Sequence, residues 1–251
     1  MIMKAPGEIR IFADFEALSR AAAELFVDIS RKSVAAEGRF AVVLAGGHTP
    51  KRTYELLARP PFSRQVPWER CHIFWGDERC VPPEDARSNA RMAKEALLDQ
   101  VPVPPDHIYP ILCTENPRQA AERYEGLLQR FFDGGPPRFD LIFLGLGENG
   151  HTASLFPETQ VLTETQRWAA DVTVKEGDLV RVTLTAPILN LGKTVAFLVS
   201  GKNKAQVFRQ VMKGAAGPEH LPARLIRPEP GKLLWLVDRP ANGLAEAEER
   251  V

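Results

Sequence analysis

One histidine, His151, occupies a position that favours chemistry. It follows an apolar run, Leu141 to Leu146, and the glycines Gly145, Gly147 and Gly150. Such a run predicts a strand buried on both faces of a parallel sheet, and the glycines permit a sharp bend at its carboxyl end. Open α/β sheets bind ligands beyond these ends, and histidine titrates near neutral pH. His151 is therefore a candidate general base; the alternative is a hydrogen-bonded loop histidine.

Two glycine-containing turns each join a predicted strand to a predicted helix. One follows the apolar run 40–45, and the other follows the run 194–199. Free backbone N–H groups and the positive end of a helix dipole make such turns suitable for anions. The first turn lacks Walker spacing; a turn without a ligand, or solvated lysines in the second, are the alternatives. The candidate phosphate-binding residues are Gly46, Gly47, His48, Thr49 and Lys202.

Charged residues follow another short apolar run, 71–75. Three stand in a row, Asp77 to Arg79, which favours a polar site over a single solvated turn residue. Arg181 lies on the alternating segment 180–184, which predicts a half-exposed strand and leaves its side chain in either the site or solvent. Since parallel strands end at one edge of a sheet, we expect Asp77, Arg79 and Lys202 to converge on His151 there.

Apolar strands and amphipathic helices alternate along the chain, with connections long enough for parallel pairing. Asp14 is a candidate N-cap and Gly38 a candidate terminator of the first helix. Thr49 and Pro50 suit the N-cap and first position of the second. We predict a Rossmann-like, doubly wound α/β fold with a mainly parallel sheet flanked by helices, and a single domain over residues 1–251.

Composition excludes several classes of protein. The 251 residues include 32 basic and 32 acidic side chains, so a nucleic-acid or membrane partner is not expected. Apolar runs fall short of the roughly 20 residues that cross a bilayer, and the start lacks the apolar core of a signal peptide. Cys71, Cys80 and Cys113 show no metal-ligand spacing. We interpret them as reduced thiols of a cytoplasmic protein, without a disulfide or zinc.

Known motifs narrow the chemistry further. The glycines 145–150 match G-x-G-x-x-G, and Asp171 lies at a suitable distance for a ribose hydroxyl. His151 and Pro157, however, stand where a dinucleotide-binding helix should run. No nucleophile elbow or metal motif is found. The remaining interpretation is a cofactor-free site in which a histidine, a carboxylate and cations transfer a proton or activate water on a phosphorylated substrate.

Several blocks resemble the 6-phosphogluconolactonase family. The most specific read Trp-Gly-Asp-Glu-Arg at 75–79 and Gly-His-Thr-Ala-Ser-Leu-Phe-Pro at 150–157. Others lie at 44–50, 88–89, 181–185, 187–190, 200–202 and 235–238. The resemblance implies hydrolysis of 6-phospho-D-glucono-1,5-lactone to 6-phosphogluconate in the pentose phosphate pathway, without metal or organic cofactor, on a fold like that of glucosamine-6-phosphate isomerase.

The resemblance also implies roles for individual residues. His151 would be the general base and Asp77 its support, and Arg79 and Lys202 would bind the anion together with the loop 46–49. Arg181 is a further candidate for the anion. His48 replaces the family's usual serine, and Asn149 replaces an aspartate, so Asn149 receives no catalytic role. We expect a cytoplasmic monomer.

Two other functions share these residues. Glu-Asn-Gly-His at 148–151 also occurs in the related deaminases, but the Phe-Asn-Glu-Pro-like segment that follows there is absent here. A non-catalytic sugar-phosphate sensor could use the same crevice. It would need an output module, for which the chain has no spare length. Lactone hydrolysis is the function that the sequence favours.

Overall fold

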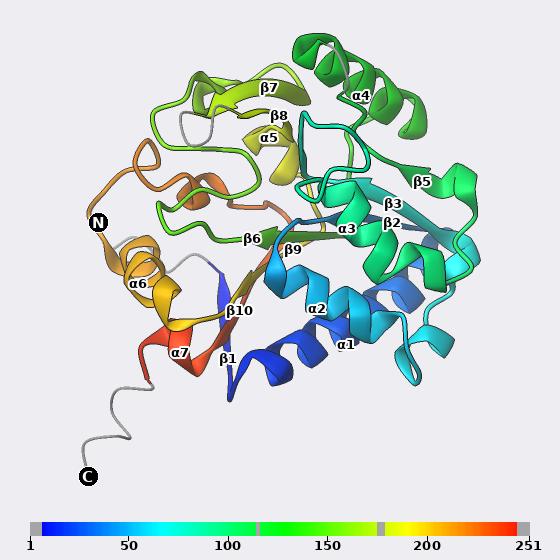
Figure 1. Ribbon diagram of the computed structural model, residues 1–251, viewed down its shortest axis with the longest axis horizontal. Coiled ribbons are helices and arrows are strands. Elements are labelled where there is room, and N and C mark those ends of the chain that lie inside the picture. The colour runs from blue at the N-terminus through cyan, green and yellow to red at the C-terminus, as the bar shows by residue number, and fades with distance from the viewer. Residues whose placement is uncertain (1–6, 114–115, 175–178, 245–251) are drawn as a thin grey trace.

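The computed structural model describes residues 7–113, 116–174 and 179–244, and its centre is a seven-stranded parallel sheet. The strand order is β1-β10-β9-β6-β2-β3-β5. The prediction of a doubly wound α/β fold is confirmed: α1 and α2 cover one side of this sheet in Figure 1, and α4 with a smaller sheet lies on the other. The strands are β1 Glu8–Phe12, β2 Phe40–Leu44, β3 Cys71–Trp75, β5 Ile108–Tyr109, β6 Leu141–Gly145, β9 Thr194–Val199 and β10 Lys232–Asp238.

The helices begin and end largely where local sequence signals stand. In α1, the Asp14 side chain accepts a hydrogen bond from Ala17 N, and Gly38 closes the helix at φ 74°, as predicted. The second helix is corrected: it begins at His48, with Gly47 rather than Thr49 as N-cap. The helices are α1 Phe15–Glu37, α2 His48–Leu57, α3 Asn89–Ala96, α4 Pro117–Phe131, α5 Ala186–Leu189, α6 Ala205–Lys213 and α7 Arg239–Asn242.

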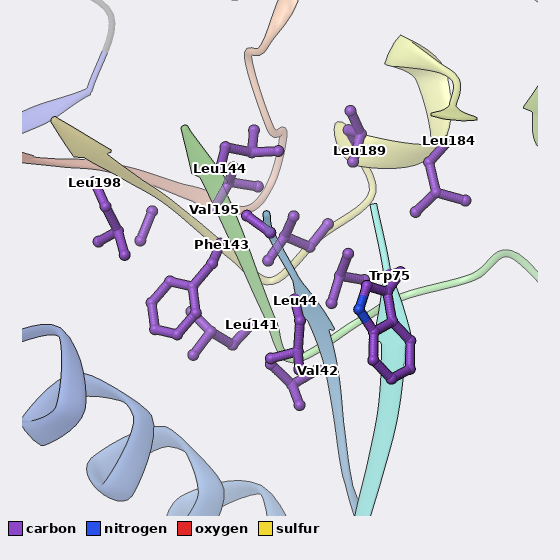
Figure 2. Close-up of a cluster of buried hydrophobic side chains, with 14 of the residues drawn as sticks. Val42, Leu44, Trp75, Leu141, Phe143, Leu144, Leu184, Leu189, Val195 and Leu198 are labelled. Atoms are coloured by element: carbon purple, nitrogen blue, oxygen red, sulfur yellow. The ribbon is translucent and has the colours of Figure 1, made fainter. Parts of the chain in front are cut away.

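The core lies along the central strands of the large sheet. Every residue of β2 is buried, and β6 and β9 are nearly so, as expected for strands covered on both faces. Figure 2 shows side chains of β2, β6 and β9 packed together. The hydroxyl of Tyr54 bonds both Ala45 N and Ala45 O, and that of Tyr124 does the same at Trp75. These tyrosines thereby hold the backbone at the carboxyl ends of β2 and β3 beside the site.

A second, antiparallel sheet changes the predicted position of the charged residues. Its strands are β4 Asp77–Arg79, β8 Leu179–Leu184 and β7 Ala169–Val174, in the order β4-β8-β7. Gly76 is the junction, since its N–H donates to Leu44 in the large sheet and its carbonyl accepts from Leu184 in the small one. Asp77 and Arg79 therefore belong to an antiparallel ladder, not to a loop at the parallel edge.

The cysteines also correct the prediction. Cys80 and Cys113 form a disulfide, with Cα atoms 4.8 Å apart. The residue order does not reveal this disulfide, because the two cysteines are close only through the fold. Cys80 follows β4, which comes directly after β3, and Cys113 follows β5, which pairs with β3. Cys71 is free and buried, and burial raises the pKa of its thiol to about 12. Within the described ranges, no helix combines the length and apolar character needed to cross a membrane.

Candidate active site

A cavity of about 610 Å³ lies where the large and small sheets meet. The loops after β2, β6 and β9 form one part of its wall, and β4 and β8 form the other. This volume is within the range of small-molecule sites. All predicted site residues except Lys202 line the cavity: Gly46, Gly47, His48, Thr49, Asp77, Arg79, His151 and Arg181.

The His151 imidazole is closely packed. Phe156 stacks against it, with ring centroids 4.1 Å apart. The backbone of Gly147 approaches the ring so closely that a Cβ there would lie 2.0 Å from His151 Nδ1. Gly147 N also donates to His151 O, which closes the loop. The glycine is therefore required by close approach of backbone and ring rather than by a dinucleotide.

Asn149 fixes which ring nitrogen of His151 carries the proton. Its Oδ1 accepts a hydrogen bond from His151 N at 3.2 Å, and the same Oδ1 lies 2.6 Å from His151 Nδ1. A backbone N–H only donates, so the atom facing it is the amide oxygen. Nδ1 must then be the protonated nitrogen, and Nε2 keeps its lone pair. Sequence reasoning gave Asn149 no role, because an amide lacks the charge of the expected aspartate.

The surroundings of His151 favour the neutral ring. Burial, followed by the charges of Arg181, Lys204 and Arg79, lowers the pKa of His151 to about 4. An imidazole with this pKa is almost entirely unprotonated at neutral pH. Its Nε2 is thus available to accept a proton, as a general base requires.

Asp77 lies buried between several partners. Its Oδ2 accepts a hydrogen bond from Ser154 Oγ at 2.6 Å and lies 3.9 Å from Arg181 Nη1. Asn89 Nδ2 donates to the Asp77 carbonyl at 2.9 Å and approaches its Oδ1 at 3.4 Å. The carboxylate is thus held inside the cavity wall. Neither Ser154 nor Asn89 had been predicted to take part.

Arg79 and Arg181 face one another across the small sheet. They are paired in the antiparallel register of β4 and β8, so their side chains lie on the same face. Arg79 Nη1 donates to Arg87 O at 2.7 Å, and the Arg181 guanidinium lies 5.0 Å from the centre of the Phe156 ring. The strand pairing resolves the alternative for Arg181 that the sequence left open: its side chain faces the cavity rather than solvent.

The first residues of α2 form a second, uncharged part of the wall. Gly47 has φ 103° and no side chain caps the helix, so its first N–H groups lack intrahelical partners. At Gly46, a Cβ would lie 1.9 Å from Asn89 Oδ1, so the loop passes where only glycine fits. The His48 ring packs on Phe15 with centroids 5.2 Å apart. This geometry suits a phosphate or other anion.

Lys204, not Lys202, reaches the cavity. The segment Lys202–Lys204 is a 3₁₀ turn, in which successive side chains point about 120° apart. Lys202 is exposed and outside the cavity lining, whereas Lys204 lines it and lies 3.9 Å from Glu148. Lys204 is thus an additional candidate for the anion, and the role of Lys202 stays a prediction. The direction of a side chain in a short 3₁₀ turn is not visible in the residue order.

Among the described residues, no three histidine, cysteine, aspartate or glutamate side chains are grouped to hold a metal ion.

Glu78, the remaining acid of the segment 77–79, has a structural role. Its carboxylate accepts hydrogen bonds from three backbone N–H groups and from Ser88 Oγ, and so organises the turn before α3. Burial raises its pKa.

Comparison with known proteins identifies the family of this chain. Residues 13–235 match the family model for glucosamine-6-phosphate isomerases/6-phosphogluconolactonase, and the chain belongs to this family. A 6-phosphogluconolactonase of Synechocystis sp. is 44% identical over 84% of this chain and 87% of its own length. One from Nostoc sp. is 38% identical, with 93% and 96% coverage.

Solved structures share the fold. The 6-phosphogluconolactonase from Trypanosoma cruzi superimposes with a TM-score of 0.85 at 26% identity, over 96% of this chain and 97% of that one. A monomeric glucosamine-6-phosphate deaminase reaches 0.80 at 22% identity, with 94% and 99% coverage. At that identity the deaminase comparison speaks for the fold alone.

Proposed function

We propose that residues 1–251 act as one catalytic domain that hydrolyses 6-phospho-D-glucono-1,5-lactone to 6-phosphogluconate. The main supporting observation is that His151 is neutral and lies in a cavity lined by Arg79, Arg181 and Lys204. Asn149 contacts Nδ1 of its ring and not Nε2. The family membership and the 44% identical lactonase support the same reaction.

In the proposed mechanism His151 Nε2 accepts a proton from water as the water oxygen attacks the lactone carbonyl carbon. The carbonyl electrons form an oxyanion, and collapse of this tetrahedral intermediate breaks the bond to the ring oxygen. That oxygen takes the proton back from the imidazolium, so His151 is regenerated neutral. A positioned general base contributes about 10²–10⁴-fold to such a step. The Nδ1–H bond to Asn149 keeps the ring in the reactive tautomer.

We assign the two charges of the substrate to different parts of the wall. We place Arg181 at the reacting centre, because it and His151 both pack on Phe156 and its charge is the first of the three cationic charges that lower the pKa of His151. Its guanidinium would stabilise the oxyanion, and Asp77 would hold it in place through the 3.9 Å contact. The phosphate would bind the N-terminus of α2 together with Lys204, where backbone N–H groups and a cation are available.

A coupled assay tests the proposal. Freshly made lactone is added to the protein, and a downstream dehydrogenase reports 6-phosphogluconate against a no-enzyme blank, because the lactone also hydrolyses spontaneously. A parallel reaction with glucosamine 6-phosphate measures ammonia release. We expect lactone turnover above the blank and no ammonia. The reverse result would favour the deaminase, and no turnover of either substrate would contradict an enzymatic function.

The histidine variant tests the mechanism in the same assay. We expect His151→Ala to lose about 10²–10⁴-fold in kcat, with an unchanged melting temperature to within a few degrees. His220→Ala is the matched control, because His220 is exposed and lies outside the cavity lining. Near-normal turnover by His151→Ala would exclude the general-base role.

We also propose that the protein works as a monomer in the cytoplasm. The sequence-based argument for the cytoplasm assumed reduced thiols, and the Cys80–Cys113 disulfide removes that argument. The proposed location is therefore inferred from the substrate, which is a soluble metabolite. Light scattering after size exclusion tests the monomer, and fractionation of cells tests the compartment.

A further inference from the structure

We propose that Ser154 is a positioning residue for Asp77. Its hydroxyl would hold the carboxylate in the orientation that keeps Oδ2 3.9 Å from Arg181 Nη1. The inference rests on the proposed function, because it concerns the position of Arg181, the group that we assign to the oxyanion.

The contact between Ser154 and Asp77 is short and buried. Ser154 Oγ donates to Asp77 Oδ2 at 2.6 Å, and Ser154 has no exposed surface. A hydrogen bond from a hydroxyl to a carboxylate at this distance belongs to the strong, charge-assisted class. Ser154 is not among the residues that line the cavity, so its effect on substrate must pass through another group.

The backbone around Ser154 is bent in a way that produces this contact. Ala153 has φ 46°, a left-handed conformation that residues with a Cβ rarely adopt. The tight turn is closed by Leu155 N donating to Thr152 O. Ser154 N in turn donates to Thr183 Oγ1, on the residue paired with Asp77 in the small sheet. The turn thus connects the His151 loop to the strand that carries Asp77.

The other contacts of Asp77 explain why such a connection matters. Arg181 Nη1 stands 3.9 Å from Oδ2, which is longer than a hydrogen-bonded ion pair. Asn89 Nδ2 reaches Oδ1 only at 3.4 Å. Without the serine hydroxyl, the carboxylate would be free to rotate toward the guanidinium. A closer Asp77–Arg181 pair would then compete with the oxyanion for Arg181.

A double-mutant cycle tests the inference. The variants are Ser154→Ala, Asp77→Asn and their combination, each measured for kcat and KM on fresh lactone. We expect Ser154→Ala to lower kcat about 10- to 100-fold, the range of a hydrogen bond to a charged group. In the Asp77→Asn background the same change should cost less than about twofold, since groups that act as a unit are not additive.

Thr152→Val is the matched control. Thr152 is buried on the same loop, but its Oγ1 donates to Gly145 O and contacts neither His151 nor Asp77. We expect its kcat to stay within about threefold of wild type and its effect to add to that of Asp77→Asn. Melting temperatures of all variants verify folding. If Asp77→Asn falls to the blank, the cycle is read instead from the Kd of 6-phosphogluconate by calorimetry.

The outcomes separate this inference from the proposed function. Wild-type protein without lactone turnover would overturn the function itself. With an active wild type, an unchanged kcat in Ser154→Ala would overturn the positioning role. So would an equal loss in both backgrounds, because a merely structural residue weakens every variant alike.

Discussion

The two walls of the cavity contribute different chemistry. The edge of the large parallel sheet supplies backbone: the N-terminus of α2 after β2, and the glycine loop that carries His151 after β6. The small antiparallel sheet supplies charged side chains, Asp77, Arg79 and Arg181. Each loop of the first wall is a contiguous segment that follows one strand, whereas the second wall exists only because β4 and β8 pair.

This difference shows how one cavity can bind the phosphate and the developing oxyanion of one substrate with different groups. A phosphate is bound well by free N–H groups and a cation, which need little reorganisation during the reaction. A developing oxyanion needs donors placed for the transition state, and side chains on paired strands are held at fixed positions. The His151 loop belongs to the first wall and is joined to the second through the hydrogen bond from Ser154 to Asp77.

The largest expected effect concerns the backbone wall. In Gly147→Ala the new methyl group would lie 2.0 Å from His151 Nδ1, so the imidazole must move. A displacement of about 1 Å can cost roughly 10²-fold in rate, and we expect kcat/KM to fall by at least that factor. Gly126→Ala in α4 is the control, because its methyl group meets only Arg130 Nη1 at 3.5 Å. Wild-type kinetics for Gly147→Ala would contradict the contact.

A smaller effect distinguishes two neighbouring lysines. We expect Lys204→Ala to raise KM about 10-fold with little change in kcat, since it removes a cation from the phosphate side of the cavity. Lys202→Ala should leave KM within about twofold, because that side chain is exposed outside the lining. Steady-state kinetics on fresh lactone measure both. A larger KM increase for Lys202→Ala would reverse the assignment.

The smallest effect at neutral pH should come from Asn149→Asp. A carboxylate beside Nδ1 favours the imidazolium, so the pKa of His151 should rise from about 4 by about one unit or more. The base is active when unprotonated, so activity is present above this pKa and lost as pH falls through it. We therefore expect the acid limb of kcat/KM to move to higher pH, with little change at pH 7.5.

A pH profile between about 4 and 8, corrected for spontaneous hydrolysis, measures this shift. Asn242→Asp in α7 adds the same charge away from the cavity and should leave the acid limb in place. An unmoved limb in Asn149→Asp would argue against His151 as the titrating base.

Predictions from the sequence were accurate where the signal is contiguous. The buried run 141–146 followed by glycines predicted the strand and the bend that carries His151. The turn 46–49 predicted a glycine loop leading into a helix, although α2 begins at His48 rather than after Thr49. Both depend on residues within one strand and the following turn. The prediction of reduced thiols failed, because Cys80 and Cys113 lie on distant segments that only the fold brings together. Lys204 was missed as a residue of the cavity wall, because the residue order does not show which way side chains point in a short 3₁₀ turn.

The sequence by itself determined the alternation of buried strands and helices, the family resemblance and the residue types available for chemistry. Local backbone preferences and apolar periodicity act over a few residues, and so they can be recognised in the residue order. Only the tertiary structure decided that Arg181 faces Arg79, that Ser154 holds Asp77, and that Asn149 sets the tautomer of His151. The first two contacts arise from strand pairing and packing between separate segments, which no local pattern specifies. The third joins residues two apart, and it depends on the three-dimensional bend of their loop.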